Sequence, residues 1–103
     1  MRLRQIAHSR TGDKGNTINI SLIAFDERDY GRLEAMVTAD RVKHHFADIV
    51  HGEVVRYELP QLGALNFVFR RGPRDSVTQT LGLDAHGKTL SSALLDLEIG
   101  DLT

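Results

Sequence analysis

The sequence from Asn16 to Phe25 is NTINISLIAF. Apolar side chains at every second position from Ile18 to Ala24 alternate with threonine, asparagine and serine. This period of two is typical of a strand with one face against a core and the other toward solvent. Ile23 and Phe25 interrupt the polar alternation, so the far end of this strand is predicted to be buried on both faces.

A second, weaker strand pattern precedes it at Arg2–His8, with arginines that suit the edge of a sheet. Between the two patterns, Ser9–Gly15 has the sequence SRTGDKG, which we interpret as the loop of a hairpin. The predicted pair of strands is therefore antiparallel and lies at one side of a sheet.

Helical spacing begins after Asp29, a predicted N-cap, with Tyr30, Leu33 and Val37 at intervals of three and four. Thr38 is predicted to cap a second helix, which Gly52 ends. The apolar stripe of that helix is Val42, Phe46, Ile49 and Val50.

The second half of the chain continues with a strand that Pro60 follows, at the expected first position of a new helix. Residues Leu62–Phe69 fit helical spacing, although Leu65, Phe67 and Phe69 also fit a strand; the proline favours the helix. The remaining predicted elements are strands at Val55–Leu59, Val77–Leu83 and Ala93–Ile99, with a turn at Asp84–Gly87 between the last two.

This order of elements predicts one α+β domain over residues 1–103, ferredoxin-like, with an antiparallel sheet and helices on one face. An extra N-terminal strand and a C-terminal hairpin are added to that pattern. The uncovered face of such a sheet is a common place for pairing, so a homo-oligomer is expected.

Composition narrows the classes of function. The formal net charge is −1, with 13 Lys and Arg against 14 Asp and Glu, whereas nucleic-acid binders usually carry a basic excess. The chain has no cysteine, so disulfides, thiolate catalysis and cysteine-bound zinc are excluded. The sequence has neither a bilayer-spanning apolar run nor a signal-peptide core, and the expected location is the cytoplasm.

The segment from His8 to Asn16 is the candidate site. Its two glycines would let backbone N–H groups converge on an anion, Arg10 would add a bidentate contact and Lys14 a point charge. The other interpretation is a hairpin loop with a surface Asp–Lys pair. The candidate anion-binding residues are Arg10, Thr11, Gly12, Asp13, Lys14, Gly15 and Asn16, with His8 as the candidate for proton transfer.

Other polar residues favour structural roles. His44 and Asp48 have a spacing that could ligate a metal, but no third ligand is evident, and neither a metal nor a cofactor is expected. The basic cluster Arg70, Arg71 and Arg74 could guide an anionic substrate or form a solvated loop. Asn66 interrupts an apolar run, so its amide requires a hydrogen bond if it is buried.

Five short motifs occur in order: RTGDKGN at 10–16, Val42 with His45-Phe46, RYELP at 56–60, ALNFV at 64–68 and LDAHGK at 83–88. Together they resemble the small ferredoxin-fold domain at the C-terminus of acyclic terpene utilisation proteins, over essentially the whole chain. The large N-terminal domain of that family is linked with bacterial breakdown of terpenoid and branched acids as coenzyme A thioesters. No catalytic residue of the small domain is implied.

The resemblance implies a detached small partner: an accessory or binding subunit that works with a larger catalytic chain and meets a coenzyme A thioester or another anionic small molecule. The alternative is a small enzyme acting alone on an acyl-phosphate or thioester, with Arg10 holding the anion and His8 or Asp13 transferring a proton. Nucleic-acid binding through the uncovered sheet face is the least favoured class, because Phe25 is the one aromatic residue of Asn16–Phe25.

Overall fold

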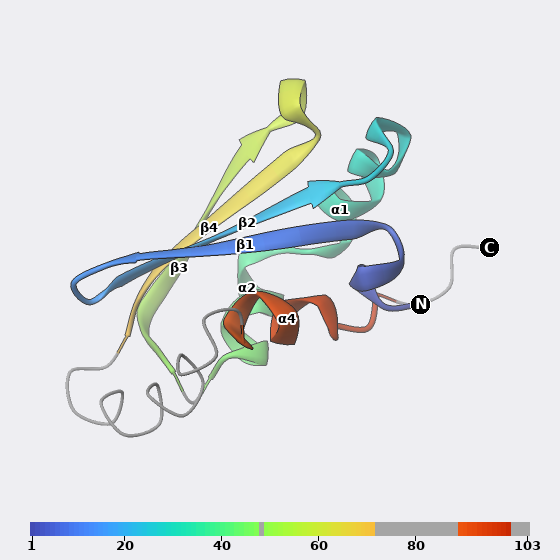
Figure 1. Ribbon diagram of the computed structural model, residues 1–103. Coiled ribbons are helices and arrows are strands. Elements are labelled where there is room, and N and C mark those ends of the chain that lie inside the picture. The colour runs from blue at the N-terminus through green and yellow to red at the C-terminus, as the bar shows by residue number, and fades with distance from the viewer. Residues whose placement is uncertain (48, 72–88, 100–103) are drawn as a thin grey trace.

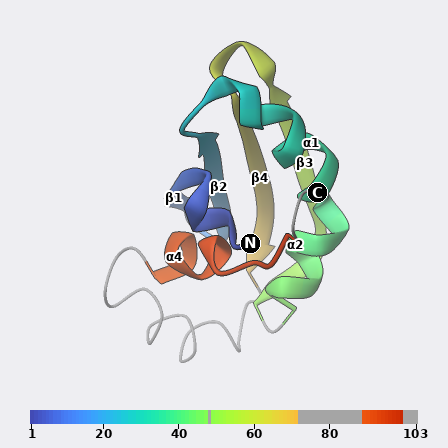
Figure 2. The same ribbon diagram turned by 90° about the vertical axis from the view of Figure 1, so that its right-hand side faces the viewer.

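The computed structural model describes residues 1–47, 49–71 and 89–99. A four-stranded antiparallel sheet in the order β1-β2-β4-β3 forms its main layer, and the three helices within these residues lie on one side of that sheet (Figures 1 and 2). The strands are β1 (Ala7–Lys14), β2 (Thr17–Ala24), β3 (Val50–Leu59) and β4 (Ala64–Arg71). The helices are α1 (Tyr30–Met36), α2 (Ala39–His45) and α4 (Thr89–Leu95), with single 3₁₀ turns η1 (Leu3–Gln5), η2 (Glu27–Asp29) and η3 (Pro60–Leu62).

The connections confirm the predicted α+β, ferredoxin-like class. β2 and β3 are both antiparallel to β4, which lies between them, so β2 and β3 are parallel to each other. Because α1 and α2 join these two strands, the unit is a split β-α-β motif. The outer position beside β2 is taken by β1, an extra N-terminal strand as predicted, although it lies later in the chain than the predicted Arg2–His8.

The core lies between the sheet and the helices. Six alternate residues of β2 and β4 point toward the helices and are at most 1% exposed, and three apolar helix residues that meet them are equally buried. These side chains are Ile18, Ile20, Leu22, Leu65, Phe67 and Phe69 from the sheet, and Leu33, Val42 and Leu94 from the helices. The apolar alternation from Ile18 to Leu22 therefore faces this core, as predicted. The predicted burial of the far end on both faces is wrong, because Phe25 is 65% exposed.

The predicted helix at Leu62–Phe69 is wrong. Pro60 begins only the single turn η3, which Gly63 closes with a left-handed φ of 61°. The next residue starts β4, in which Leu65, Phe67 and Phe69 lie on one face and are buried. Burial of these three side chains at a period of two outweighs the local preference that proline gives to a helix start.

The two ends of the described chain also differ from the prediction. Ala93–Leu95 is the last turn of α4 rather than part of a strand. The residues after it pair with the N-terminal segment, through Leu3 N to Leu97 O at 3.1 Å and Ile99 N to Met1 O at 2.9 Å. At the other end, η1 replaces most of the strand predicted at Arg2–His8. The strand predicted at 77–83 and the turn at 84–87 lie outside the described residues.

The helix boundaries are partly as predicted. Thr38 caps α2 as expected, accepting a hydrogen bond from Arg41 N at 3.2 Å. Asp29 makes no side-chain cap; Asp26, one turn earlier, accepts from Arg28 N at 2.9 Å. The predicted end of the second helix at Gly52 is wrong, because α2 ends at His45 and Gly52, with φ of 85°, lies at an irregularity in β3.

Candidate functional site

The predicted loop at the candidate site is wrong. β1 pairs with β2 residue by residue from Ala7 opposite Ala24 to Lys14 opposite Thr17. Only Gly15 and Asn16 form the turn, where Gly15 supplies the positive φ of 65°. Because β1 is extended and joined to β2, its glycine Gly12 does not belong to a loop that could fold around an anion.

The strand conformation separates the predicted site residues onto two faces. His8, Arg10 and Gly12 lie opposite Ile23, Ser21 and Asn19, whereas Thr11 and Asp13 lie opposite Ile20 and Ile18. Directly opposed residues share a face, and Ile18 and Ile20 are core residues. Thr11 therefore faces the helices; its Oγ1 is buried and has no hydrogen-bond partner among the described residues.

The other side of the sheet carries no described helix, and we call it the open face (Figure 2). It consists of the alternate residues of each strand that do not point into the core. They are His8, Arg10, Gly12, Thr17, Asn19, Ser21, Ile23, His51, Val55, Tyr57, Leu59, Ala64, Asn66, Val68 and Arg70.

A polar row crosses the middle of the open face. Arg10, Ser21, Asn66 and Tyr57 occupy one register line over the four strands. Ser21 Oγ donates a hydrogen bond to Asn66 Oδ1 at 3.2 Å, which confirms that the amide within the apolar run is hydrogen-bonded. With strands about 4.8 Å apart, the row is about 14 Å long.

Apolar side chains flank this row. On β3 the exposed fractions are 45% for Val55, 53% for Tyr57 and 38% for Leu59. At the end of β2, Phe25 is 65% exposed and its ring stacks on that of His8, with ring centroids 5.4 Å apart and an interplanar angle of 20°. The arrangement combines hydrogen-bonding groups at the centre with aromatic and aliphatic surface on both sides.

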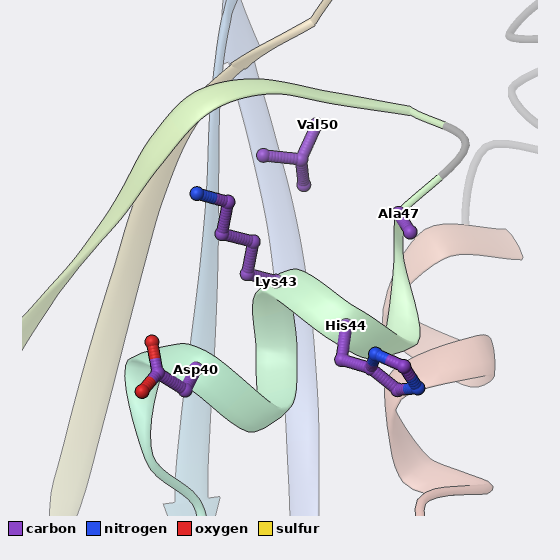
Figure 3. A pocket seen from close by; sticks show the side chains of 5 residues that line it. All are labelled: Asp40, Lys43, His44, Ala47 and Val50. Atoms are coloured by element: carbon purple, nitrogen blue, oxygen red, sulfur yellow. The ribbon is translucent and has the colours of Figure 1, made fainter.

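The other side of the molecule has two hollows beside α2. One has a volume of about 340 Å³ and is lined by Asp40, Lys43, His44, Ala47 and Val50 (Figure 3). Lys43 extends from α2 toward β3, and its Nζ lies 2.9 Å from Glu53 Oε1. The second, of about 420 Å³, shares Asp40 and His44. Lys43, the lysine that lines the first hollow, is therefore already paired with a carboxylate.

The two adjacent histidines have different surroundings. His45 Nε2 lies 2.7 Å from the carbonyl oxygen of Ala93, which joins α2 to α4, whereas His44 lines both hollows. No group of three histidine, aspartate or glutamate side chains that could hold a metal occurs in the described ranges. Asp48, considered above as a ligand with His44, lies outside them, as does Arg74 of the basic cluster.

Tyr57, Ser21 and Asn66 are candidate functional residues that sequence reasoning did not assign to the site. Each is one member of an alternating strand pattern, and only the register joins them to Arg10. Had Ala64–Arg71 been predicted as a strand, Asn66 would have been expected on the face opposite Leu65 and Phe67.

Comparison with known families decides the classification. Residues 1–100 match the model of the family described as the AtuA ferredoxin-like domain. The chain belongs to this family. The resemblance inferred from the five sequence motifs is thus confirmed, and so is the association with the terpene utilisation family. Neither the curated proteins nor the solved structures gave a match to this AtuA ferredoxin-like domain. None of its described helices is long and apolar enough to cross a bilayer.

Proposed function

We propose that this AtuA ferredoxin-like domain is an accessory subunit in bacterial catabolism of terpenoid or branched acyl-coenzyme A thioesters, and that its open face binds a larger catalytic chain. The observation that supports the proposal is the exposure of Val55, Tyr57 and Leu59 along one edge of that face. Contiguous apolar surface beside polar groups is characteristic of protein interaction sites. We place this role in the cytoplasm.

The surroundings of His8 favour binding over catalysis. Within the described residues its ring stacks on Phe25, and no side-chain hydrogen bond joins it to an acid, a base or a nucleophile. Proton transfer in catalysis needs a partner within hydrogen-bond reach of the base or its substrate. The stacked rings of His8 and Phe25 beside Arg10 are better suited to binding another molecule than to catalysing a reaction.

Anion recognition remains part of the proposal, now centred on Arg10 rather than on a glycine loop. The exposed guanidinium lies in the same row as the Ser21 hydroxyl and the Asn66 amide. Such a set could hold a carboxylate or phosphate by charge-assisted hydrogen bonds.

The first experiment is affinity capture from a native lysate with the tagged domain and its Tyr57→Asp variant. We expect a larger protein to be recovered with the wild type and lost with the variant, because a charge replaces an exposed aromatic contact. Ala47→Asp is the matched control, since it adds the same charge to an exposed residue beside α2. Recovery of only a second copy of the chain would replace the accessory role with homo-oligomer formation.

The alternative function is a small enzyme that acts alone on an acyl-phosphate or thioester. Its support is that His8 and Arg10 lie on one face, two residues or about 7 Å apart along β1. Purified protein would then hydrolyse an acyl-phosphate or acyl-coenzyme A, and His8→Ala would abolish the turnover while leaving the fold intact. Equal rates for the two proteins would eliminate this alternative.

A further inference from the structure

The open face has an unusual charge composition. It carries Arg10 and Arg70, and no described aspartate or glutamate occupies a register position on it. The acidic strand residues belong to the other side: Glu58 lies opposite the buried Leu65, and Glu53 pairs with Lys43 of α2. A chain with a formal net charge of −1 therefore presents a locally cationic sheet surface.

Arg10 and Arg70 also differ from the other arginines whose side chains the structure describes. The others each pair with a carboxylate or donate to a carbonyl oxygen; they are Arg2, Arg4, Arg28, Arg32, Arg41 and Arg56. Within the described ranges, Arg10 and Arg70 have neither kind of contact, and both are exposed. Their charges are thus available to a group outside the chain.

The spacing of the two cations suits a large binding partner. Arg10 is on β1 in the row of Ser21, and Arg70 is on β4 in the row of Thr17. Two strand spacings across the sheet and four residues along it separate their backbones by about 17 Å. Small ligands usually bind in concave sites. The two hollows lie beside α2 and not on the open face, so this face is better suited to a large partner.

We propose that the open face docks an acidic protein surface, whose carboxylates face Arg10 and Arg70 and whose apolar side chains cover Val55, Tyr57 and Leu59. This inference rests on the proposed function, because it specifies the chemistry of the larger chain. Tyrosine and arginine are enriched among residues that contribute most to protein interfaces. A second copy of the chain is disfavoured as the occupant, since two open faces in contact would oppose cations with no described carboxylate between them.

The first test uses a defined acidic polymer. Backbone amide shifts would be recorded by NMR during titration with poly-L-glutamate, poly-L-lysine and an oligouridylate. We expect poly-L-glutamate to shift amides of β1, β2 and β4, and Arg10→Gln with Arg70→Gln to reduce its affinity at least about tenfold. Arg28→Gln removes the same charge from an arginine paired with Asp26 and should leave the affinity within about twofold.

Shifts of equal size with poly-L-lysine, or binding that the double variant retains, would overturn the inference. Binding of the oligouridylate but not of poly-L-glutamate would assign the face to nucleic acid instead. Because both arginines are exposed, the far-ultraviolet circular dichroism of the variants should match that of the wild type.

The second test uses the natural partner. A photo-crosslinking amino acid at position 57 would be introduced in native cells, and the captured protein would be purified and its binding rate measured. We expect association to slow about tenfold or more from about 50 to about 500 mM NaCl, and this dependence to weaken in the double variant. Capture of a larger chain whose association rate depends neither on salt nor on the two substitutions would refute the proposal of an acidic partner surface. The accessory role would remain intact. Capture of no larger chain would contradict both.

Discussion

Nη1 of Arg56 lies 3.0 Å from the carbonyl oxygen of Val37, the residue that closes α1. The same nitrogen lies 2.7 Å from the carbonyl oxygen of Glu34, and Nη2 lies 2.8 Å from Glu58 Oε2. The last carbonyl groups of a helix have no partner within it, so β3 supplies the donors that the end of α1 lacks. The arginine of the RYELP motif thus has a structural role, adjacent in sequence to the exposed Tyr57.

Arg56→Met should lower the free energy of unfolding by about 2 kcal/mol, because two carbonyl oxygens lose a charged donor. Equilibrium unfolding in urea measures this change. Arg56→Lys should lose less, since an ammonium group keeps the charge but not the forked geometry. Tyr57→Ser, on the exposed side of the same strand, should be within about 0.5 kcal/mol of the wild type. A loss in Arg56→Met no larger than that in Tyr57→Ser would show that the carbonyl contacts contribute nothing.

The sequence was sufficient to predict features that depend on a local hydrophobic period or on a single helix-capping residue. Alternation placed Ile18, Ile20 and Leu22 in a strand facing the core, and Thr38 at the start of α2. Sequence failed where burial by distant parts of the chain outweighs local preference. Pro60 favours a helix, yet burial of Phe67 and Phe69 against the helices makes the following segment a strand.

The candidate site was only partly predictable for a related reason. The two glycines of SRTGDKG suggested a loop, but Gly12 pairs with β2 and only Gly15 requires a turn conformation. Arg10 and His8 were identified from their chemistry. Their neighbours on the open face come from β3 and β4, and no spacing within the sequence shows which residues the register brings together.

The contact between Gly12 and Asn19 yields a second prediction. A methyl group at Gly12 would lie 3.1 Å from Asn19 Nδ2 and 3.2 Å from its Oδ1, so the amide must move to accept it. Gly12→Ala alone should therefore destabilise the protein by less than about 1 kcal/mol. The steric cost is partly offset because alanine loses less backbone entropy than glycine on folding.

In the Asn19→Ala background the same substitution should be stabilising, by about 0.5 kcal/mol, because the obstructing amide is gone. A double-mutant cycle in urea measures the coupling between the two positions. Additive effects would show that the close approach has no energetic consequence. Large destabilisation in both backgrounds would instead show that position 12 requires glycine for a reason other than the Asn19 amide.

A third prediction concerns stability in acid. A hydrogen bond from Arg4 lowers the pKa of Asp96, with smaller electrostatic contributions from Arg4, Arg2 and His45. In the unfolded state the Asp96 carboxyl has a pKa near 3.8. At a pH between this value and the lower native pKa, the unfolded carboxyl is protonated while the native one stays ionised. The stabilisation is fully present above that value and is lost as the pH falls through the lower native pKa.

Thermal unfolding of the wild type and Asp96→Asn between pH about 2 and 7 checks this dependence. We expect the variant to have the lower Tm near neutral pH and the two Tm values to converge in acid. Asp40→Asn, which removes a carboxylate that forms no described ion pair with Arg4, should leave the difference between neutral and acidic Tm unchanged. A constant gap between wild type and Asp96→Asn at every pH would contradict a role for ionisation.

The last prediction concerns Tyr30, at the start of α1. Its Oη is buried and has no hydrogen-bond partner among the described residues, and burial, with the nearby charges of Glu34 and Glu58, raises its pKa above 10. Leaving a buried hydroxyl unpaired costs free energy that phenylalanine avoids. Tyr30→Phe should therefore increase the free energy of unfolding by about 1 kcal/mol near neutral pH, measured in urea.

The pH dependence distinguishes this cause from simple packing. Because the native pKa is raised, the native state keeps its proton where the unfolded tyrosine loses one, so wild-type stability falls as the pH rises beyond 10. Tyr30→Phe lacks that group and should retain more of its stability there, which widens its advantage over the wild type. Tyr57→Phe, whose hydroxyl belongs to an exposed residue, should give no advantage at either pH. Lower stability of Tyr30→Phe at neutral pH would contradict the prediction. It would mean that the Tyr30 hydroxyl has a stabilising hydrogen-bond partner outside the described residues.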